Sequence, residues 1–192
     1  ELIKILQVRN IDSFVESRRQ KTSEKDRKTV QSILNDVRKN GDSAVKKYER
    51  KFNGKGEFAQ VNLRVDIWEK RRVRRKITEA QRDALRSSAR RLDDVQLRLK
   101  KGLIGSVKNL PGVSFIPISS VGCYVPGGQA RYPSSAIMSA ITATEAGVKR
   151  IVITSPSGPD GKIDPMTIAV AKKCGAEIYK VGGAQAIGAL AY

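Results

Sequence analysis

Short apolar segments alternate with segments of small, helix-forming residues through residues 112–192, and this alternation constrains the fold more than any other feature. We expect strands over residues 113–118, 120–125, 150–154 and 177–181. We expect helices over residues 134–146 and 165–174 and from residue 184 onward. Nearly continuous apolar strands separated by helices are typical of a parallel sheet that is covered on both faces. The pattern therefore predicts an α/β fold.

Two glycine-rich turns follow predicted strands of this sheet. Residues 122–128 read Gly-Cys-Tyr-Val-Pro-Gly-Gly, and residues 182–187 read Gly-Gly-Ala-Gln-Ala-Ile. Glycine lets backbone amides come close to a phosphate, and a helix N-terminus favours an anion. Open α/β sheets bind nucleotides at the carboxyl ends of their strands. The turns therefore indicate nucleotide binding, although the usual dinucleotide motif GxGxxG is absent.

Tyr124 and Gln185 are the candidate ligand contacts in these turns. The Tyr124 ring could cover a nicotinamide or an adenine, and its hydroxyl could bond to a ribose or a phosphate. The amide of Gln185 can both donate and accept beside free backbone N–H groups. The alternatives are a tyrosine that packs at a turn and a glutamine that bonds to its own backbone. Ser134 or Ser135 offers a hydroxyl nearby, and we expect one of them to cap the helix.

The first 110 residues are predicted to be mainly helical. Residues 24–39 carry an apolar stripe with helical spacing and end at Asn40-Gly41, and a second short helix follows to residue 52. Residues 61–65 alternate as in a half-exposed strand. Thr78 and Gln81 form a capping-box pattern that opens a helix of about 23 residues. Its apolar face is formed by Leu85, Ala89, Leu92, Val95 and Leu99. We therefore divide the chain into a helical region, 1–110, and an α/β unit, 111–192.

The charge of the chain is concentrated in the helical region. The whole sequence has 37 Lys/Arg and 19 Asp/Glu, and residues 111–192 hold only 7 and 4 of them. A basic region of this kind suggests nucleic-acid binding, and residues 71–76 form its densest cluster. No aromatic residues are interleaved for base stacking. We favour solvated helix faces and do not expect a nucleic-acid partner.

Several kinds of site and location are excluded or disfavoured by composition. The chain contains no histidine, which excludes histidine acid–base catalysis and histidine metal ligands from these residues. Cys123 and Cys174 lack metal-site spacing, and we expect two reduced, incidental thiols. Cys123 also lacks a histidine that could activate it as a nucleophile. There is no apolar run long enough to span a membrane and no signal-peptide pattern at the start.

Four motifs taken together resemble the histidinol dehydrogenase family. They are Val-Gly-Cys-Tyr-Val-Pro-Gly-Gly at 121–128, Tyr-Pro-Ser-Ser at 132–135, Ala-Gly-Val at 146–148 and Val-Gly-Gly-Ala-Gln-Ala-Ile at 181–187. The resemblance is dense from residue 119 to 192 and looser around residues 37–52. It implies Rossmann-like domains similar to those of aldehyde dehydrogenases, preceded here by the helical region.

The resemblance also implies an activity. Enzymes of this family use NAD and zinc to oxidise L-histidinol, through bound L-histidinal, to L-histidine at the end of histidine biosynthesis, and they are cytoplasmic homodimers. The tyrosine and glutamine of the matching motifs fall on Tyr124 and Gln185, which implies that both contact NAD. Cys123 replaces a small aliphatic residue of the family, and we expect little effect from this departure.

The family's Glu-His catalytic pair and its zinc ligands (Gln, Asp and two His) belong to motifs beyond residue 192. We therefore expect neither catalytic nor metal-binding residues in this chain, and we expect it to be a part of a longer enzyme. The helix that includes Leu190 reaches the last residue, and the sheet lacks further strands to complete it. A rival hypothesis from another class is a basic nucleic-acid-binding or regulatory module that retains the scaffold without catalysis.

Overall fold

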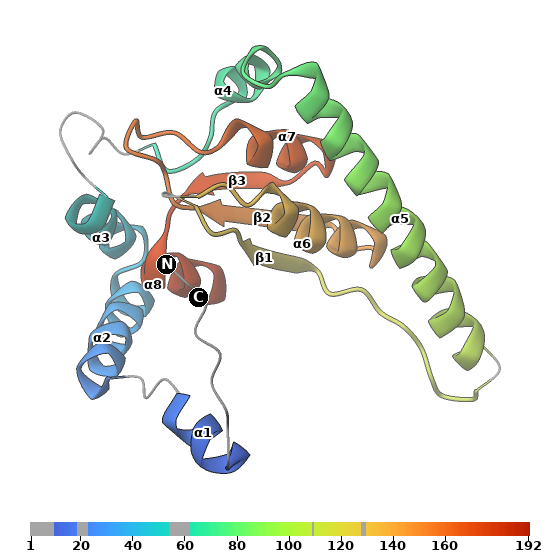
Figure 1. Cartoon of the computed structure of the whole chain (residues 1–192), viewed down its shortest axis with the longest axis horizontal. Helices are drawn as coiled ribbons and strands as arrows, with labels where there is room; N and C mark the ends of the chain where they lie inside the picture. Colours follow the sequence, from blue (N-terminus) through green and yellow to red (C-terminus); the bar gives the residue numbers. More distant parts are fainter. Residues whose placement is uncertain (1–9, 19–22, 54–61, 109, 128–129) are drawn as a thin grey trace.

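Three parallel strands in the order β1-β2-β3 form the centre of the molecule (Figure 1). The computed structural model describes residues 10–18, 23–53, 62–108, 110–127 and 130–192. β1 (Ser120–Tyr124) pairs with β2 (Arg150–Ser155), and β2 pairs with β3 (Glu177–Lys180). Helices α6 (Pro133–Glu145) and α7 (Pro165–Lys173) connect successive strands. The expected α/β fold with a parallel sheet is confirmed.

The larger core lies between the sheet and helices α6 and α7. Cys123, Ile153 and Ile178 point from the three strands into this core and are at most 5% exposed. Small side chains on α6, including Ala136 and Ala140, are fully buried and let the helix lie close to the strands. Asp164 accepts a hydrogen bond from the backbone of Thr167 and so caps the start of α7, as an aspartate before Pro165 would suggest.

A second core covers the opposite face of the sheet. Helix α8 (Gly183–Ala191) packs on this face, and Leu190 lies directly against Gly122 of β1. The hairpin of α2 (Glu24–Asn40) and α3 (Asp42–Asn53) packs against α8 in turn. The buried side chains of this core are Ile33, Val37, Ala44, Val45, Tyr48, Val181 and Ala186. The N-terminal hairpin therefore reaches the sheet through α8.

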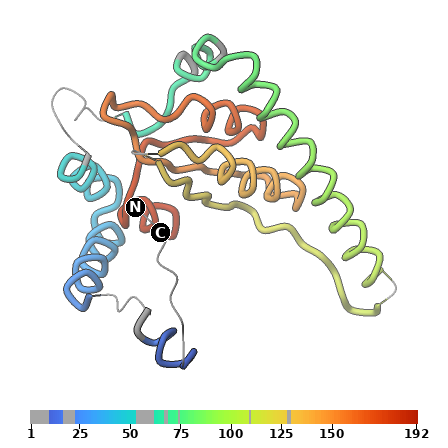
Figure 2. The backbone as a smooth tube through the Cα atoms, viewed as in Figure 1, coloured from blue at the N-terminus to red at the C-terminus, as the bar shows by residue number. Residues whose placement is uncertain are grey.

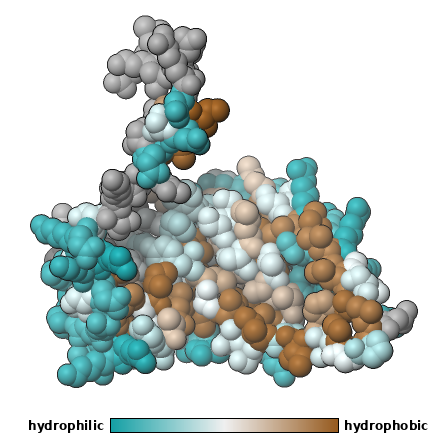
Figure 3. Space-filling view, turned by 90° about the horizontal axis from the view of Figure 1, so that it is seen from below, coloured by the Kyte–Doolittle hydropathy of each residue, from teal (hydrophilic) through white to brown (hydrophobic). Residues whose placement is uncertain are grey.

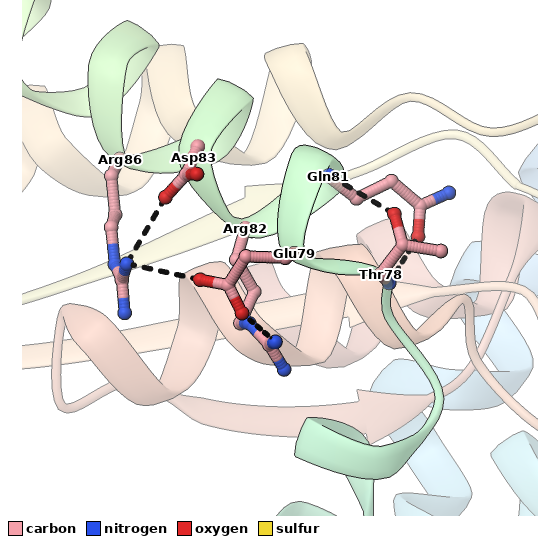
Figure 4. A network of polar contacts seen from close by, with 6 residues as sticks. All are labelled: Thr78, Glu79, Gln81, Arg82, Asp83 and Arg86. Carbon is pink, nitrogen blue, oxygen red and sulfur yellow. Dashed lines mark hydrogen bonds and ion pairs between the residues drawn. The ribbon is translucent and has the colours of Figure 1, made fainter.

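Helix α5 (Glu79–Val107) is 29 residues long, six more than the expected 23. The predicted capping box is confirmed, since Thr78 Oγ1 accepts from the Gln81 amide and Gln81 Oε1 accepts from the Thr78 amide (Figure 4). Ion pairs of Glu79 with Arg82 and of Asp83 with Arg86 follow in the first two turns (Figure 4). These contacts fix the start of α5 at Glu79, shortly after the 3-10 turn η2 (Val73–Arg75).

Only the first half of the apolar face of α5 is covered. Ala89 is buried, and Leu85 and Leu92 pack against the larger core. Val95 and Leu99 were expected on the same buried stripe, but they are 51% and 54% exposed. The helix continues past α6 toward the far end of the molecule (Figure 2), so its C-terminal turns extend beyond the helix that covers its start.

Two predicted strands are wrong. Residues 113–118 form no strand and pair with no other described segment, and Ile116 is 83% exposed. Pro117 cannot donate a backbone hydrogen bond there. Of residues 61–65, residue 61 lies outside the described residues, and the rest form only an isolated antiparallel bridge between Arg64 and Tyr179. In both cases the segment has the apolar or alternating pattern of a strand, but it has no partner strand to pair with along its length.

Other details of the helical region were not foreseen. Helices α1 (Ile11–Arg18) and α4 (Ile67–Arg72) and the 3-10 turn η2 (Val73–Arg75) were not predicted.

The expected serine cap of α6 is also wrong, because Tyr132 occupies the cap position without a side-chain bond and Pro133 begins the helix. No helix in the described part of the chain is both long enough and apolar enough to cross a membrane.

Exposed apolar side chains gather on one face of the molecule, over the C-terminal half of α5 and the segment 110–118 (Figure 3). The exposed apolar residues of these two segments are Val95, Leu97, Leu99, Leu103, Ile104, Leu110, Val113, Phe115, Ile116 and Ile118. The division of the chain near residue 110 stays a prediction. Elements on its two sides pack together, α5 on α6 and the hairpin on α8.

Candidate functional site

Tyr124 joins the two glycine-rich turns. It is the last residue of β1, and its hydroxyl accepts a hydrogen bond of 3.3 Å from the backbone amide of Gly183. The two residues are 59 positions apart in the sequence. Tyr124 is 36% exposed, so part of its ring faces solvent at the carboxyl edge of the sheet. The structure thus brings together the two motifs that the sequence singled out.

Gln185 lies in the first turn of α8 and is only 1% exposed. Its side-chain nitrogen donates a hydrogen bond of 2.8 Å to Oε1 of Glu49, a residue of α3. The same Glu49 oxygen accepts a second bond, of 2.9 Å, from the Gly182 amide. The side-chain oxygen of Gln185 is buried without a hydrogen-bond partner. Gln185 therefore holds the N-terminal hairpin against α8 and retains one acceptor that the protein leaves unused.

Glu49 was not identified from the sequence. The available signal was its position four residues after Val45 and next to Tyr48, which places a carboxylate on the apolar side of α3. A glutamate is rarely buried without a partner, so this placement indicates a polar contact inside the protein. The partner itself could not be read from the pattern, because it lies 136 residues away.

The glycines of the turns are required by packing between the turns themselves. A Cβ atom at Gly182 would lie 2.8 Å from Cβ of Pro156, which follows β2. A Cβ atom at Gly127 would lie 2.8 Å from the Ser155 hydroxyl. Gly183 has φ +58°, a conformation that other residues rarely adopt. The turns after β1 and β3 therefore both pack against the turn after β2, which contains Pro156. Gly128 lies outside the described residues.

A cavity of about 360 Å³ lies beside this edge of the sheet, between the turns that precede α6 and α7. Its lining includes the cationic residues Lys76, Arg131 and Lys162. Asp164 also lines it, and its carboxylate lies 3.5 Å from Nε of Arg131. Tyr124 and Gln185 are not among the residues that line this cavity, so they form a separate, adjacent group at the sheet edge.

Neither cysteine has the properties of a nucleophile. Both thiols are free, in agreement with the expected reduced state. Burial raises the pKa of the Cys123 thiol, and a hydrogen bond with Ser139 offsets only part of that rise. Burial raises the pKa of the Cys174 thiol as well. Both thiols are therefore mostly protonated near neutral pH, where only a thiolate would be reactive.

The described residues contain no cluster of three or more cysteine, aspartate or glutamate side chains that could hold a metal ion. The chain has no histidine anywhere. The described residues therefore do not fit a zinc site.

The comparison with known families settles what kind of chain this is. Residues 16–192 match the family model of histidinol dehydrogenase. The chain belongs to the histidinol dehydrogenase family. Among curated members of that family, it is 41% identical to the histidinol dehydrogenase of Geobacillus kaustophilus over 174 residues, and 40% identical to that of Methanosarcina barkeri over 176 residues. The resemblance drawn from the sequence motifs is confirmed.

The family relatives are longer than this chain. The two alignments cover 88% and 86% of this chain but 40% and 39% of those histidinol dehydrogenases. The crystal structure of histidinol dehydrogenase from Elizabethkingia anophelis has the same fold, with a TM-score of 0.76 and 24% identity. That match covers 94% of this chain and 42% of the crystallised one. The chain thus spans about two fifths of the proteins that it resembles.

Proposed function

We propose that this chain supplies the NAD-binding part of an enzyme that oxidises L-histidinol, through L-histidinal, to L-histidine. The observation that carries the proposal is the family match, which extends over residues 16–192. The convergence of both glycine-rich turns on Tyr124 supports it, since this edge of an α/β sheet is where nucleotides bind.

The proposed NAD contacts are Tyr124 and Gln185. The partly exposed ring of Tyr124 offers a flat surface to a nicotinamide or an adenine, and its hydroxyl already lies in the turn. The side-chain oxygen of Gln185 is a buried acceptor without a partner, which suits a ligand that brings an N–H or O–H donor. These groups fit the cofactor. NAD, when bound, takes up the hydride that the substrate loses.

The remaining groups of the reaction are proposed to lie outside this chain. The zinc ligands and the acid–base pair belong to family motifs that these 192 residues do not contain, and the chain has no histidine. We propose that the complete enzyme is a cytoplasmic homodimer that takes L-histidinol as a small-molecule substrate, without a nucleic-acid or membrane partner.

An activity assay of the full-length protein tests the proposal. Purified protein is mixed with L-histidinol, NAD and zinc, and reduced cofactor is followed by its absorbance. We expect two equivalents of reduced cofactor for each histidinol converted to histidine, because the oxidation proceeds from alcohol to aldehyde to acid. Absence of turnover in protein that is folded and loaded with zinc would contradict the proposed activity.

The rival hypothesis, a regulatory or nucleic-acid-binding module, is tested by the gene itself. The reading frame past Tyr192 is expected to continue into a sequence that contains the downstream histidines. A genuine stop codon directly after Tyr192 in an intact gene would overturn the enzyme hypothesis for this polypeptide and favour the rival.

A further inference from the structure

Glu49 is a buried carboxylate that lies on the N-terminal hairpin and contacts the proposed cofactor turn. It is 9% exposed, and its Oε1 accepts from both the Gly182 amide and Nε2 of Gln185. We propose that Glu49 is a positioning residue: it orients the Gln185 amide so that its oxygen, and not its nitrogen, is offered to the cofactor. This inference rests on the proposed NAD-binding function.

The chemistry of the two side chains fixes the orientation. An ionised carboxylate can only accept hydrogen bonds, whereas an amide has a donor end and an acceptor end of nearly equal shape. Glu49 therefore binds the Nε2 end of Gln185, at 2.8 Å. The Oε1 end must then point away from Glu49, and it is the buried atom without a partner. Any polar neighbour that could also donate would allow the amide to flip.

The free oxygen is buried against the turn that begins α8. It would be 2.9 Å from a Cβ atom at Gly183, so only glycine at that position leaves room for it. The Gly183 amide donates to the hydroxyl of Tyr124. The acceptor thus belongs to a residue two positions after Gly183, whose amide makes the contact that joins β1 to α8. It is suited to an N–H or O–H donor of the cofactor, either a ribose hydroxyl or the nicotinamide carboxamide.

Glu49 also changes which part of a dinucleotide can bind at this turn. Gly182 is the N-cap residue of α8, and the positive end of a helix dipole is a favourable place for an anion. Here the Glu49 carboxylate already occupies that place and takes the Gly182 amide. A phosphate at the same turn would meet a like charge. The turn therefore recognises a neutral donor group of the cofactor, and the phosphates bind elsewhere.

A double-mutant cycle in the full-length protein tests the proposal, with the dissociation constant of NAD measured by titration calorimetry. The variants are Glu49→Gln, Gln185→Ala and the two combined. Glu49→Gln keeps the size and one acceptor but adds a donor, so the amide of Gln185 is free to flip. We expect this change alone to weaken NAD binding five- to thirtyfold, the effect of one misplaced hydrogen bond. In the Gln185→Ala background it should change the affinity less than twofold.

The control is Glu24→Gln, which removes the same charge from an exposed position on the same hairpin and should leave NAD affinity unchanged. ADP-ribose, which lacks the nicotinamide, shows which donor is used. Weakening of NAD alone assigns the carboxamide, and weakening of both ligands assigns the ADP-ribose part.

The outcomes separate this inference from the proposed function. A wild-type protein that binds no NAD refutes the proposed function. A wild type that binds NAD, with Gln185→Ala weaker and Glu49→Gln unchanged, overturns the role of Glu49. If Glu49→Gln weakens NAD binding equally in the wild type and in the Gln185→Ala variant, the role of Glu49 is also overturned. Its effect on NAD affinity would then not depend on the Gln185 amide.

A measurement on the unaltered protein avoids dependence on variants that fail to fold. The side-chain NH₂ protons of Gln185, observed by NMR, should stay protected from solvent exchange both with and without NAD, because Glu49 holds them in either state. Release of these protons on NAD binding would show that the cofactor takes the nitrogen end, and the proposal would be wrong.

Discussion

A single hydroxyl, that of Tyr124, contacts a turn that comes 59 residues later in the chain. The bond is long, at 3.3 Å, and it satisfies the amide of Gly183 at the start of α8, where no preceding carbonyl of the helix is available. A ligand that approached this edge could replace the tyrosine as the acceptor or could bond to its hydroxyl. Tyr124 is therefore the residue whose alteration should report most directly on cofactor binding.

The first prediction concerns the two proposed NAD contacts. In the full-length enzyme, Tyr124→Ala and Gln185→Ala should each raise the apparent KM for NAD five- to thirtyfold, because each removes a contact of roughly 1–2 kcal/mol. Zinc content should not change. Tyr132→Phe, at an exposed tyrosine near the start of α6, serves as the control. Unchanged NAD kinetics in both alanine variants would show that neither residue contacts the cofactor.

The second prediction concerns Asp36, whose carboxylate bonds to Lys47 at 2.7 Å across the hairpin. The Lys47 ammonium, with further bonds from Asn40 and Tyr48, lowers the pKa of Asp36 from 3.8 to about 2. Because the pKa falls on folding, the pair stabilises the fold above pH 3.8, and that contribution is lost as the pH falls through 2. An NMR titration of the Asp36 carboxyl carbon should have its midpoint near pH 2.

Lys47→Met should move that midpoint up toward the ordinary value. Lys46→Met removes an identical charge one position away, outside this hydrogen bond, and should leave it in place. A midpoint near 3.8 in the unaltered protein would contradict the ion pair.

The residues of the site differ in how far the sequence could reveal them. Tyr124 and Gln185 stand in glycine-rich turns whose local composition marks them. Glu49 stands in an ordinary amphipathic helix, and only the packing of α3 on α8 brings it to Gly182 and Gln185. No local sequence pattern could predict this contact, because the groups that bond to the buried Glu49 carboxylate lie 133 and 136 residues away.

Helices and strands were predictable where two independent signals agreed. The start of α5 carries both a capping box and an apolar stripe, and α7 carries Asp164 as a cap before Pro165. Residues 113–118 carried only one signal, their hydrophobicity. A β-strand also needs a neighbouring strand to bond with its backbone, and hydrophobicity alone does not show that one is present. The predicted end of α5 came too early for a related reason. The last turns of α5 remain helical although their apolar side chains are no longer covered by other elements.

The third prediction uses two glycines in different elements. A Cβ atom at Gly122 of β1 would lie 2.7 Å from Cδ2 of Leu190, so Gly122→Ala must displace α8 and should cost about 1–3 kcal/mol of unfolding free energy. Gly102 lies in α5 with open space around it, so Gly102→Ala should stabilise the protein by about 1 kcal/mol.

Chemical denaturation of both variants measures the difference. Equal effects at the two positions would mean that α8 does not pack on β1 as described.

The molecule as a whole has one sheet with a core on each face, and its exposed apolar side chains gather on one side (Figure 3). Scattered exposed apolar residues are ordinary, but contiguous ones favour association. The neighbouring apolar residues of α5 and of segment 110–118 include Leu99, Leu103, Phe115 and Ile116. The net charge of +18 opposes association at low salt, and added salt screens that repulsion.

The fourth prediction is that residues 1–192, produced alone, are inactive and bind zinc no better than background. The chain has no histidine to serve as a base or as a zinc ligand, and no cluster of three other ligands exists among the residues that the structure describes. Mixing the chain with histidinol, NAD and zinc should give no reduced cofactor above the rate without protein. Turnover that a chelator abolishes would show that the catalytic groups lie within these residues.

The hydrogen bond between Glu49 and Gly182 spans 133 residues, and this separation has a consequence during synthesis. A ribosome that adds roughly 5–20 residues per second needs about 7–27 s to reach Gly182 after Glu49, whereas helices form within about a microsecond. For those seconds the surface that covers Ile33, Val37 and Tyr48 in the complete fold does not yet exist. The lysines and arginines of the hairpin surround that apolar stripe with like charge, which opposes association between nascent chains. We therefore expect the charge of the hairpin to matter most before Gly182 is added to the chain.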